Sequence, residues 1–157
     1  MDMNNSQEHE FVDLSLPSGA LWATCNVGAS KPEDYGDYFS WDNGKTAVAK
    51  WGKSWEMPSK EQWEELKENT KSSWTTRNGV NGRLFTSNNG NSLFLPAAGY
   101  RGECFLYGVG SYGNYWSSSL DMDHPSYAMG FRFHSIDTGM GGDYRTYGRP
   151  VRAVLEN

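Results

Sequence analysis

The clearest alternation of apolar and polar positions lies late in the chain, in residues 127–134. Its apolar members are Met129, Phe131 and Phe133, and the positions between them are Gly130, Arg132 and His134. A period of two is typical of a strand with one face on a core and the other in solvent. We therefore predict a strand whose first set of side chains points inward and whose second set points outward.

The start of the chain shows the same period in a shorter form. Residues 10–27 read as strand, turn and strand, with the turn at Pro17-Ser18-Gly19 and with Leu21 and Ala23 opposite their neighbours. We expect a hairpin at the start of a sheet, and a final strand in residues 149–156.

One helix is well marked, in the stretch MPSKEQWEELKENT. Ser59 is placed as an N-cap, Gln62 follows three residues later as in a capping box, and Trp63 and Leu66 give an apolar stripe. The preceding residues 28–45 are rich in Gly, Asp and Asn and are predicted to form a loop. We expect its rings to hold this loop on the core, and these are Tyr35, Tyr38, Phe39 and Trp41.

Residues 74–100 contain three dipeptides that tolerate positive φ. They are Asn78-Gly79, Asn81-Gly82 and Asn89-Gly90. Such pairs are typical of tight turns between strands. We predict two short strands with tight turns, ending in the apolar run Leu93–Ala98.

Composition and charge narrow the class of protein. The chain has 157 residues, a net charge of -5 and no basic run, so a nucleic-acid partner is not expected. No apolar segment reaches the roughly 20 residues that cross a bilayer, and the first residues do not resemble a secretion signal. We predict a frayed segment, residues 1–10, and one domain, residues 11–157.

Conventional catalytic and metal-binding patterns are weak. Cys25 and Cys104 could form a disulfide or remain two buried thiols, and no Cys or His pair has metal-ligand spacing, so no metal or cofactor is predicted. The SWDNG stretch leaves a structural calcium ion open. A serine hydrolase is not expected, since Ser117-Ser118-Ser119 near His124 lack a nucleophile elbow. GVGSYG is a weak match to a dinucleotide-binding motif, because no helix pattern follows it.

Several segments resemble one known family together and in its order. They are FVDLSLPSGALWATCNVGASKPEDYGDYFSW, WEMPSKEQWEEL, WTTRNGVNG, NGNSLFLPAAGYR, YWSSS and YGRPVRAV. Over about residues 11–154 the chain resembles the family first described as the major paralogous domain of Fibrobacter succinogenes, which is abundant in gut Bacteroidetes.

The resemblance implies an α+β fold and a binding function. It implies the C-type-lectin-like fold of the formylglycine-generating-enzyme subtype, with a small twisted antiparallel sheet, few helices and long loops. Members of that fold class include variable proteins of diversity-generating retroelements, whose carboxyl-terminal region is rewritten to alter ligand binding. The related oxidase uses paired cysteines near its carboxyl end, which this chain lacks there, so we expect no enzyme.

The residue usage of the carboxyl-terminal region is consistent with such rewriting. Randomised adenines in an AAC or AAT codon never yield Lys, Glu, Gln, Trp or Met. The first four types occur 25 times in residues 1–116 and are absent from residues 117–155, where about eight would be expected in proportion. Met122, Met129 and Met140 must then be fixed positions. Tight loops also favour Gly, Ser, Asp and Tyr, so the alternative that this chain is an ordinary family member without diversification stays open.

We predict that the recognition surface is formed by outward side chains of the late strand and its loops. The candidate residues are Asp121, Asp123, His124, Ser126, Gly130, Arg132, His134, Asp137, Asp143, Tyr144, Arg145 and Tyr147. The expected partner is a protein or glycan on a cell or phage surface, and the resemblance implies a bacterial surface or a phage particle as location. The alternatives are a fixed-specificity adhesin or carbohydrate-binding module, and an enzyme related to the formylglycine-generating oxidase.

Overall fold

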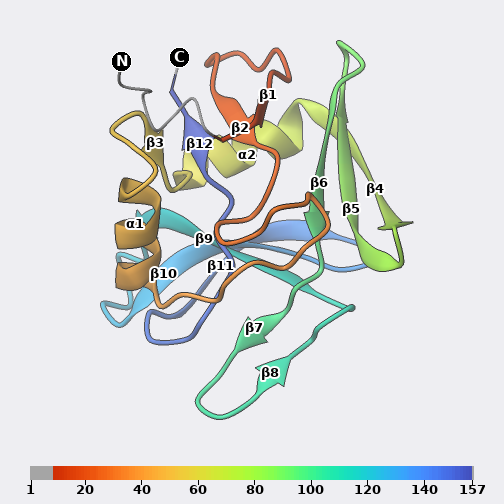
Figure 1. The fold of residues 1–157 in the computed structure, drawn as a ribbon. Coiled ribbons are helices and arrows are strands. Elements are labelled where there is room, and N and C mark those ends of the chain that lie inside the picture. Colours follow the sequence, from red (N-terminus) through yellow and green to blue (C-terminus); the bar gives the residue numbers. More distant parts are fainter. Residues whose placement is uncertain (1–8, 157) are drawn as a thin grey trace.

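The chain is mostly β, with two short helices and several small antiparallel sheets, an α+β arrangement (Figure 1). The computed structural model describes residues 9–156. Residues 1–8 of the segment predicted to be frayed, and residue 157, lie outside the described residues. Within that segment His9 is described, and its ring stacks on Trp51 with 3.7 Å between ring centroids.

The helices are α1 (Trp41–Ala49) and α2 (Lys60–Glu68). The strands are β1 (Phe11–Val12), β2 (Leu21–Ala23), β3 (Trp55–Glu56), β4 (Thr70–Arg77), β5 (Val80–Ser87), β6 (Ser92–Pro96), β7 (Tyr100–Arg101), β8 (Leu106–Tyr107), β9 (Gly113–Leu120), β10 (Tyr127–Phe133), β11 (Thr138–Tyr144) and β12 (Val154–Leu155). Neither helix in the described part of the chain is long and apolar enough to cross a membrane.

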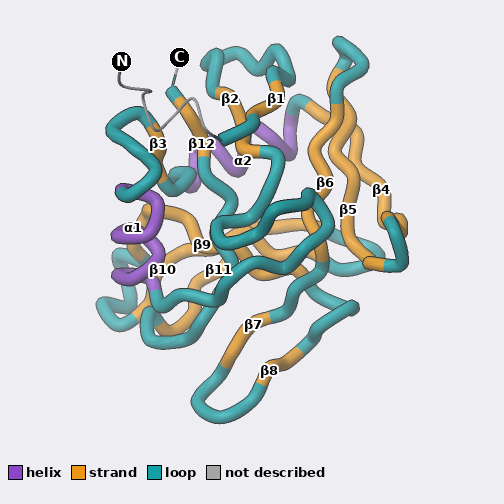
Figure 2. Tube along the Cα trace, viewed as in Figure 1, coloured by secondary structure: helices purple, strands orange, loops and turns teal. Residues whose placement is uncertain are grey.

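The strands form four sheets. Their orders are β1-β2-β12-β3, β4-β5-β6, β11-β10-β9 and β7-β8. The β7–β8 hairpin projects from the body of the molecule, below the β9–β11 sheet in the view of Figure 1. Between the sheets run long loops, above all residues 24–40, which are drawn in teal in Figure 2.

The predicted helix is confirmed as α2. The Ser59 side chain accepts a hydrogen bond from the Gln62 backbone N–H, and the Gln62 side chain accepts one from the Ser59 backbone N–H, so the capping box is complete. Trp63 and Leu66 are fully buried. Trp63 stacks on Phe131 of β10, with 4.7 Å between centroids, so α2 covers the inner face of the β9–β11 sheet.

The prediction that residues 28–45 form a loop is wrong at its end, because α1 begins at Trp41. Ser40 caps this helix by accepting a hydrogen bond from the Asn43 backbone N–H at 3.3 Å. Trp41 and Val48 are seven residues apart and both buried, so they form an apolar stripe that the Gly-rich composition concealed. The expectation that Trp41 and Phe39 pack on the core is confirmed.

The middle region holds three strands instead of the two predicted. Asn78 and Gly79 do form a turn with positive φ, of 49° and 82°, and Gly90 does so at 90°. Gly82, however, lies inside β5, where a Cβ would come within 2.3 Å of the Leu95 carbonyl oxygen. Asn81-Gly82 is therefore a close approach of two strands, and the turn predicted there is wrong.

The first hairpin and the last strand belong to one sheet, β1-β2-β12-β3. The hairpin of β1 and β2 is confirmed. Of the strand predicted for residues 149–156, only β12 forms; Arg149 is buried and bonds to Asn114 of β9 and Asp143 of β11, and Arg152 is buried and bonds to the loop after β2. The Arg152 Nε donates to Asn26 Oδ1 at 2.8 Å, which holds the long loop on the core.

The cysteines form no disulfide. Cys25 is half-buried and Cys104 is exposed near the tip of the β7–β8 hairpin, and both are free. The disulfide alternative is therefore wrong, and of the two thiols neither is fully buried.

Candidate functional site

The β9–β11 sheet has two contrasting faces. On the inner face Phe131 and Phe133 are 1% exposed, as predicted, and pack with Trp63 and Phe85. On the outer face Arg132 is exposed. Arg132 lies opposite Gly139 of β11 and Asn114 of β9, so these three residues share the outer face.

Two predictions for this strand need correction. Met129 is half-exposed instead of buried, since the register shifts between Ala128 and Gly130 where β10 pairs with β9. Gly130 is buried instead of outward-facing. A Cβ there would lie 2.8 Å from the Tyr115 carbonyl oxygen and 3.8 Å from Arg149 Nη1, so Gly130 is no ligand contact.

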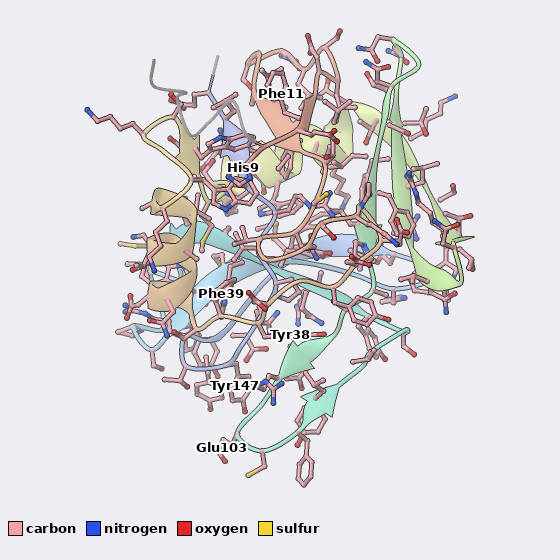
Figure 3. All side chains as sticks on the ribbon, viewed as in Figure 1. His9, Phe11, Tyr38, Phe39, Glu103 and Tyr147 are labelled. Atoms are coloured by element: carbon pink, nitrogen blue, oxygen red, sulfur yellow. The ribbon has the colours of Figure 1, made fainter. Side chains whose placement is uncertain are left out.

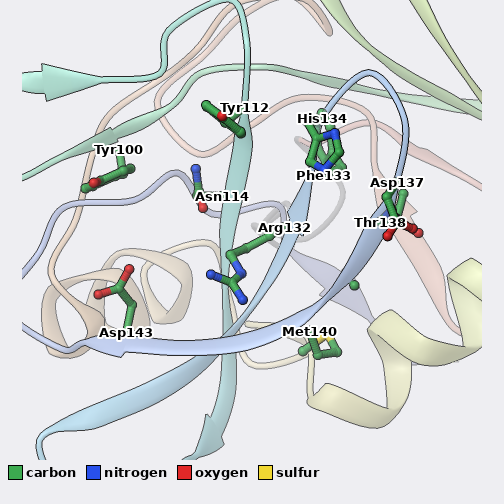
Figure 4. Close-up of a pocket in the computed structure, with 11 residues that line it drawn as sticks. Tyr100, Tyr112, Asn114, Arg132, Phe133, His134, Asp137, Thr138, Met140 and Asp143 are labelled. Carbon is green, nitrogen blue, oxygen red and sulfur yellow. Dashed lines mark hydrogen bonds between the residues drawn. The ribbon is translucent and has the colours of Figure 1, made fainter.

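An open pocket of about 450 Å³ lies on the outer face of the sheet (Figure 4). Such a volume is in the usual range for small-ligand sites. Residues from β7, β9, β10 and β11, and from the β8–β9 and β10–β11 loops, surround it. The lining residues are Tyr100, Tyr112, Asn114, Arg132, Phe133, His134, Asp137, Thr138, Gly139, Met140 and Asp143.

Two glycines of β11 shape this site, and we call them the glycine floor: Gly139 lines the pocket, and Gly141 leaves room for the Arg132 side chain. Nothing lies within 4 Å of the position that a Cβ would take on Gly139, so the space above it is open. At Gly141 a Cβ would come within 2.0 Å of Arg132 Nη2. The Arg132 guanidinium therefore lies against the backbone of β11, a position that only a glycine strand leaves vacant.

A buried arginine closes the base of the site. Arg149 is 1% exposed, donates to Asn114 Oδ1 at 3.0 Å and forms an ion pair with Asp143. Its guanidinium also lies 5.3 Å from the Tyr100 ring centroid and 5.0 Å from that of Trp116. Burial lowers the pKa of Arg149 to about 10, so Arg149 stays charged at neutral pH. Asp143 is thus a structural counter-ion for Arg149.

The loop between β10 and β11 supplies the rim. His134 is half-buried, and its Nδ1 accepts a hydrogen bond from the Ile136 backbone N–H at 3.2 Å. The Asp137 carboxylate accepts one from the Thr138 N–H at 2.8 Å. The Tyr112 ring stands edge-on to His134 at 6.1 Å.

A row of rings in contact with one another, two pairs stacked and two pairs tilted or edge-on, extends the pocket along the surface. We call it the ring row, and its members in order are His124, Tyr127, Tyr144, Tyr147 and Tyr100. Neighbouring centroids are 4.8 to 5.8 Å apart. Tyr100 belongs to both the ring row and the pocket, so the two surfaces are continuous. Figure 3 shows Tyr147 near the base of the β7–β8 hairpin, with Glu103 toward its far end.

The remaining candidate residues lie beside this surface. Asp121 is mostly covered, 3.4 Å from His124 Nδ1, and accepts a hydrogen bond from the Asp123 N–H. Asp123 and Ser126 are exposed on the β9–β10 loop, outside the pocket. Arg145 packs its guanidinium 4.6 Å from the Trp41 ring centroid and lies 3.3 Å from Asp42.

The structure therefore brings together some of the predicted residues but not all. The four that line the pocket are Arg132, His134, Asp137 and Asp143, and the three in the ring row are His124, Tyr144 and Tyr147. Sequence reasoning missed Tyr100, Tyr112 and Asn114, which lie upstream of the alternating strand. Their only signal is the clustering of Tyr and Gly in residues 100–115, which also fits an ordinary loop.

The serines near His124 have structural roles. The Ser117 hydroxyl donates to the Met129 carbonyl at 2.8 Å, and Ser119 Oγ accepts from the Lys60 backbone N–H at the start of α2. These serines therefore hold the strand that carries Trp116 to β10 and α2. In residues 9–156, no three His, Cys, Asp or Glu side chains gather as a metal site requires.

Comparison with known proteins gives no relative. No family model matches the chain, and no curated protein or solved structure matches it. The site must therefore be interpreted from its own geometry.

Proposed function

We propose that this chain is a non-enzymatic ligand-binding protein that recognises its ligand with the outer face of the β9–β11 sheet. The observation that carries the proposal is the pocket on that face, which four residues selected from sequence alone help to line. The inner face of the same strands is core, so the outer side chains can contact a ligand while the fold is held from behind.

The ring row supports a binding role. Tyrosine rings offer large contact area and lose little conformational entropy on binding, and an arginine adds a planar fork of donors. Tyr144 is 45% exposed, so its ring is accessible although it contacts the rings of Tyr127 and Tyr147. A ligand that enters the pocket would contact Tyr100, the member of the ring row that lines it.

For the fold, the proposal is the C-type-lectin-like fold of the formylglycine-generating-enzyme subtype, within the family that the sequence resembles. Short helices, small antiparallel sheets and long loops are consistent with it. The paired cysteines of the related oxidase have no counterpart near the pocket, since Cys25 and Cys104 are not among its lining residues. An enzyme of that kind is therefore not proposed.

Diversification by a retroelement would act on only part of the predicted set. Gly130, Asp143 and Arg145 are committed to packing or ion pairs, and changing them would disturb the sheet. The candidates free to vary are Asp123, His124, Ser126, Arg132, Asp137 and Tyr144, all of which are exposed.

These structural ties also favour a second candidate, a fixed-specificity adhesin or carbohydrate-binding module. Arg149 holds Asp143 and Asn114 in one arrangement at the base of the pocket, which suits a single ligand. Sequencing the gene across residues 117–154 in its native population separates the two. Adenine-linked variation at the six exposed positions, with Phe131 and Phe133 constant, is expected for a diversified protein. An invariant sequence would instead select the fixed module.

Binding itself is tested on glycan and protein arrays with the wild-type chain and a Gly139→Val variant. The valine points into open space, so we expect it to fill the pocket without disturbing the fold. Loss of a wild-type signal in the variant supports the proposal. A signal that is equal in both chains places the binding surface elsewhere and contradicts it.

A further inference from the structure

The Arg132 guanidinium has no partner among residues 9–156. No hydrogen bond, ion pair or ring contact joins it to another described side chain, whereas every other arginine has one. These contacts are Arg77 to Glu33, Arg83 to the His134 carbonyl, Arg101 to the Tyr38 ring, Arg145 to Asp42, Arg149 to Asp143, and Arg152 to Asn26. Arg132 alone is held against the glycine floor of a pocket with its donors unused.

The charges around Arg132 define what it can bind. Arg149 and Asp143 neutralise each other at the base of the pocket. Asp137 lies at the rim, where it also interacts with Arg83 outside the pocket. The guanidinium of Arg132 is therefore the one free cation among the described lining residues, beside two carboxylates. One unpaired cation balances one negative charge, so the site suits a monoanion. The second charge of a phosphate dianion would have no free cation and would lie near the Asp137 carboxylate.

The groups around that cation are neutral hydrogen-bonding groups and rings. Asn114 Oδ1 is used by Arg149, which leaves its amide N–H groups as donors. Because His134 Nδ1 accepts a hydrogen bond, its proton is on Nε2, which can donate. Tyr100 and Tyr112 add two hydroxyls on flat rings. This combination suits a compact ligand with several hydroxyls and one carboxylate.

We infer that the pocket binds an acidic sugar, with Arg132 forming a two-pronged hydrogen bond to the sugar carboxylate. An arginine fork matches the geometry of a carboxylate, and charge-assisted hydrogen bonds are roughly twice as strong as neutral ones. Tyr100, Tyr112 and His134 surround the ring of the sugar. The inference rests on the proposed binding function and names the ligand class of the same site.

Glucuronate and glucose form the matched probe pair, since they differ only in a carboxylate at one carbon. Binding is measured by titration calorimetry or NMR with the whole chain. We expect glucuronate to bind about tenfold or more tightly than glucose, because a hydrogen bond to a charged group contributes about 1.5–3 kcal/mol. Glucose 6-phosphate, a dianion, should bind less tightly than glucuronate.

Substitutions locate the effect. Arg132→Gln should reduce the affinity for glucuronate to that for glucose. The matched control is Arg77→Gln, a surface arginine outside the pocket, which should leave both affinities unchanged. Gly139→Val should abolish binding of both sugars. Thermal unfolding of each variant shows whether the fold is retained.

Three outcomes would overturn the inference. Equal affinity for glucuronate and glucose would show that the pocket does not recognise the carboxylate. Undetectable binding of both would show that the pocket does not bind a sugar. If N-acetylaspartate binds as tightly as glucuronate, the pocket reads a carboxylate without a sugar, and an acidic peptide becomes the ligand class. A glucuronate-terminated oligosaccharide, compared with free glucuronate, distinguishes a glycan end from a free sugar, and either supports the inference.

The failure of this inference and that of the proposed function are distinguishable. If an array ligand is lost in Gly139→Val but carries no acidic sugar, the pocket binds and only its ligand class is wrong. If Gly139→Val changes no array signal and no probe binds, both fail.

Discussion

The two faces of strand β10 differ in burial, with Phe131 and Phe133 buried on one and Arg132 exposed on the other. Phe131 and Phe133 are buried among Trp63, Phe85 and Tyr115, and every ring there contacts another ring. On the opposite face Arg132 lies against Gly141 and forms no hydrogen bond, ion pair or ring contact with a described residue. The comparison teaches that stability and recognition are carried by alternate residues of one short strand.

The largest expected effect is on the inner face. Phe131→Ala removes a ring that stacks on Trp63 and should lower the free energy of unfolding by about 3–5 kcal/mol. Denaturant unfolding measures the change. On the outer face Arg132→Ala should change this free energy by less than about 0.5 kcal/mol. Similar losses for the two variants would break the distinction between the faces.

The second-largest effect is expected at the ion pair between Asp143 and the buried Arg149, at the base of the pocket. Asp143→Ala leaves the buried Arg149 guanidinium without its counter-ion, and we expect a loss of about 2–3 kcal/mol in unfolding free energy, since Asp143 is partly exposed. The control is Asp137→Ala on the exposed rim, with a change within about 0.5 kcal/mol. If the two aspartates behave alike, Asp143 belongs to the ligand surface and not to the scaffold.

A smaller effect, dependent on pH, tests the scaffold far from the pocket. A hydrogen bond from Asn78, 2.9 Å away, holds the pKa of Glu33 below its ordinary value of 4.5, with Arg77 contributing. Because the folded pKa is the lower one, this stabilisation is present above pH 4.5 and is lost as the pH falls through the folded pKa.

Unfolding curves from pH 7 to pH 3 check this. Wild type should exceed Glu33→Gln in stability above pH 4.5, and the difference should shrink below it. Glu103→Gln, an exposed change at the tip of the β7–β8 hairpin, is the control and should track wild type. A constant difference across the pH range would show that the Glu33 carboxylate has no special environment.

The smallest effect concerns the glycine floor. Gly141→Ala should displace the Arg132 guanidinium, while Gly139→Ala should leave it in place, because only the first Cβ meets it. Both variants should keep the unfolding free energy within about 0.5 kcal/mol of wild type. The NMR resonance of the Arg132 Nε–H reports the position of the side chain. Equal shifts in the two variants would contradict the proposed contact.

Prediction from sequence succeeded where the signal is local. The capping box of Ser59 and Gln62 and the turn at Asn78-Gly79 depend on residues a few positions apart. It failed at α1, since the Gly44 and Asn43 that favour a loop are outweighed by the burial of Trp41 and Val48. It failed at Gly130 because the cover, Arg149, comes from a distant part of the chain.

For the site, the alternating pattern identified Arg132 as outward-facing and could not identify its surroundings. Asn114 reaches the pocket through the pairing of β9 with β10, and Tyr100 follows the backbone bridge between Arg101 and Gly148; no periodicity reveals either. Asp143 looked like a ligand contact, yet its carboxylate is taken by Arg149.

The sequence by itself determined the inward positions of Phe131 and Phe133, the outward position of Arg132, the helix α2 and the absence of Lys, Glu, Gln and Trp from residues 117–155. These features depend on the period of apolar residues and on composition, which can be read from residues that are close together in the chain. Only the tertiary structure decided that Gly139 lines a pocket, that Gly141 leaves room for Arg132, and that Arg132 has no hydrogen-bond or ion-pair partner among the described residues. The partners of a side chain and the open volume beside it depend on which distant segments pack together. The residues of one strand do not specify which segments these are.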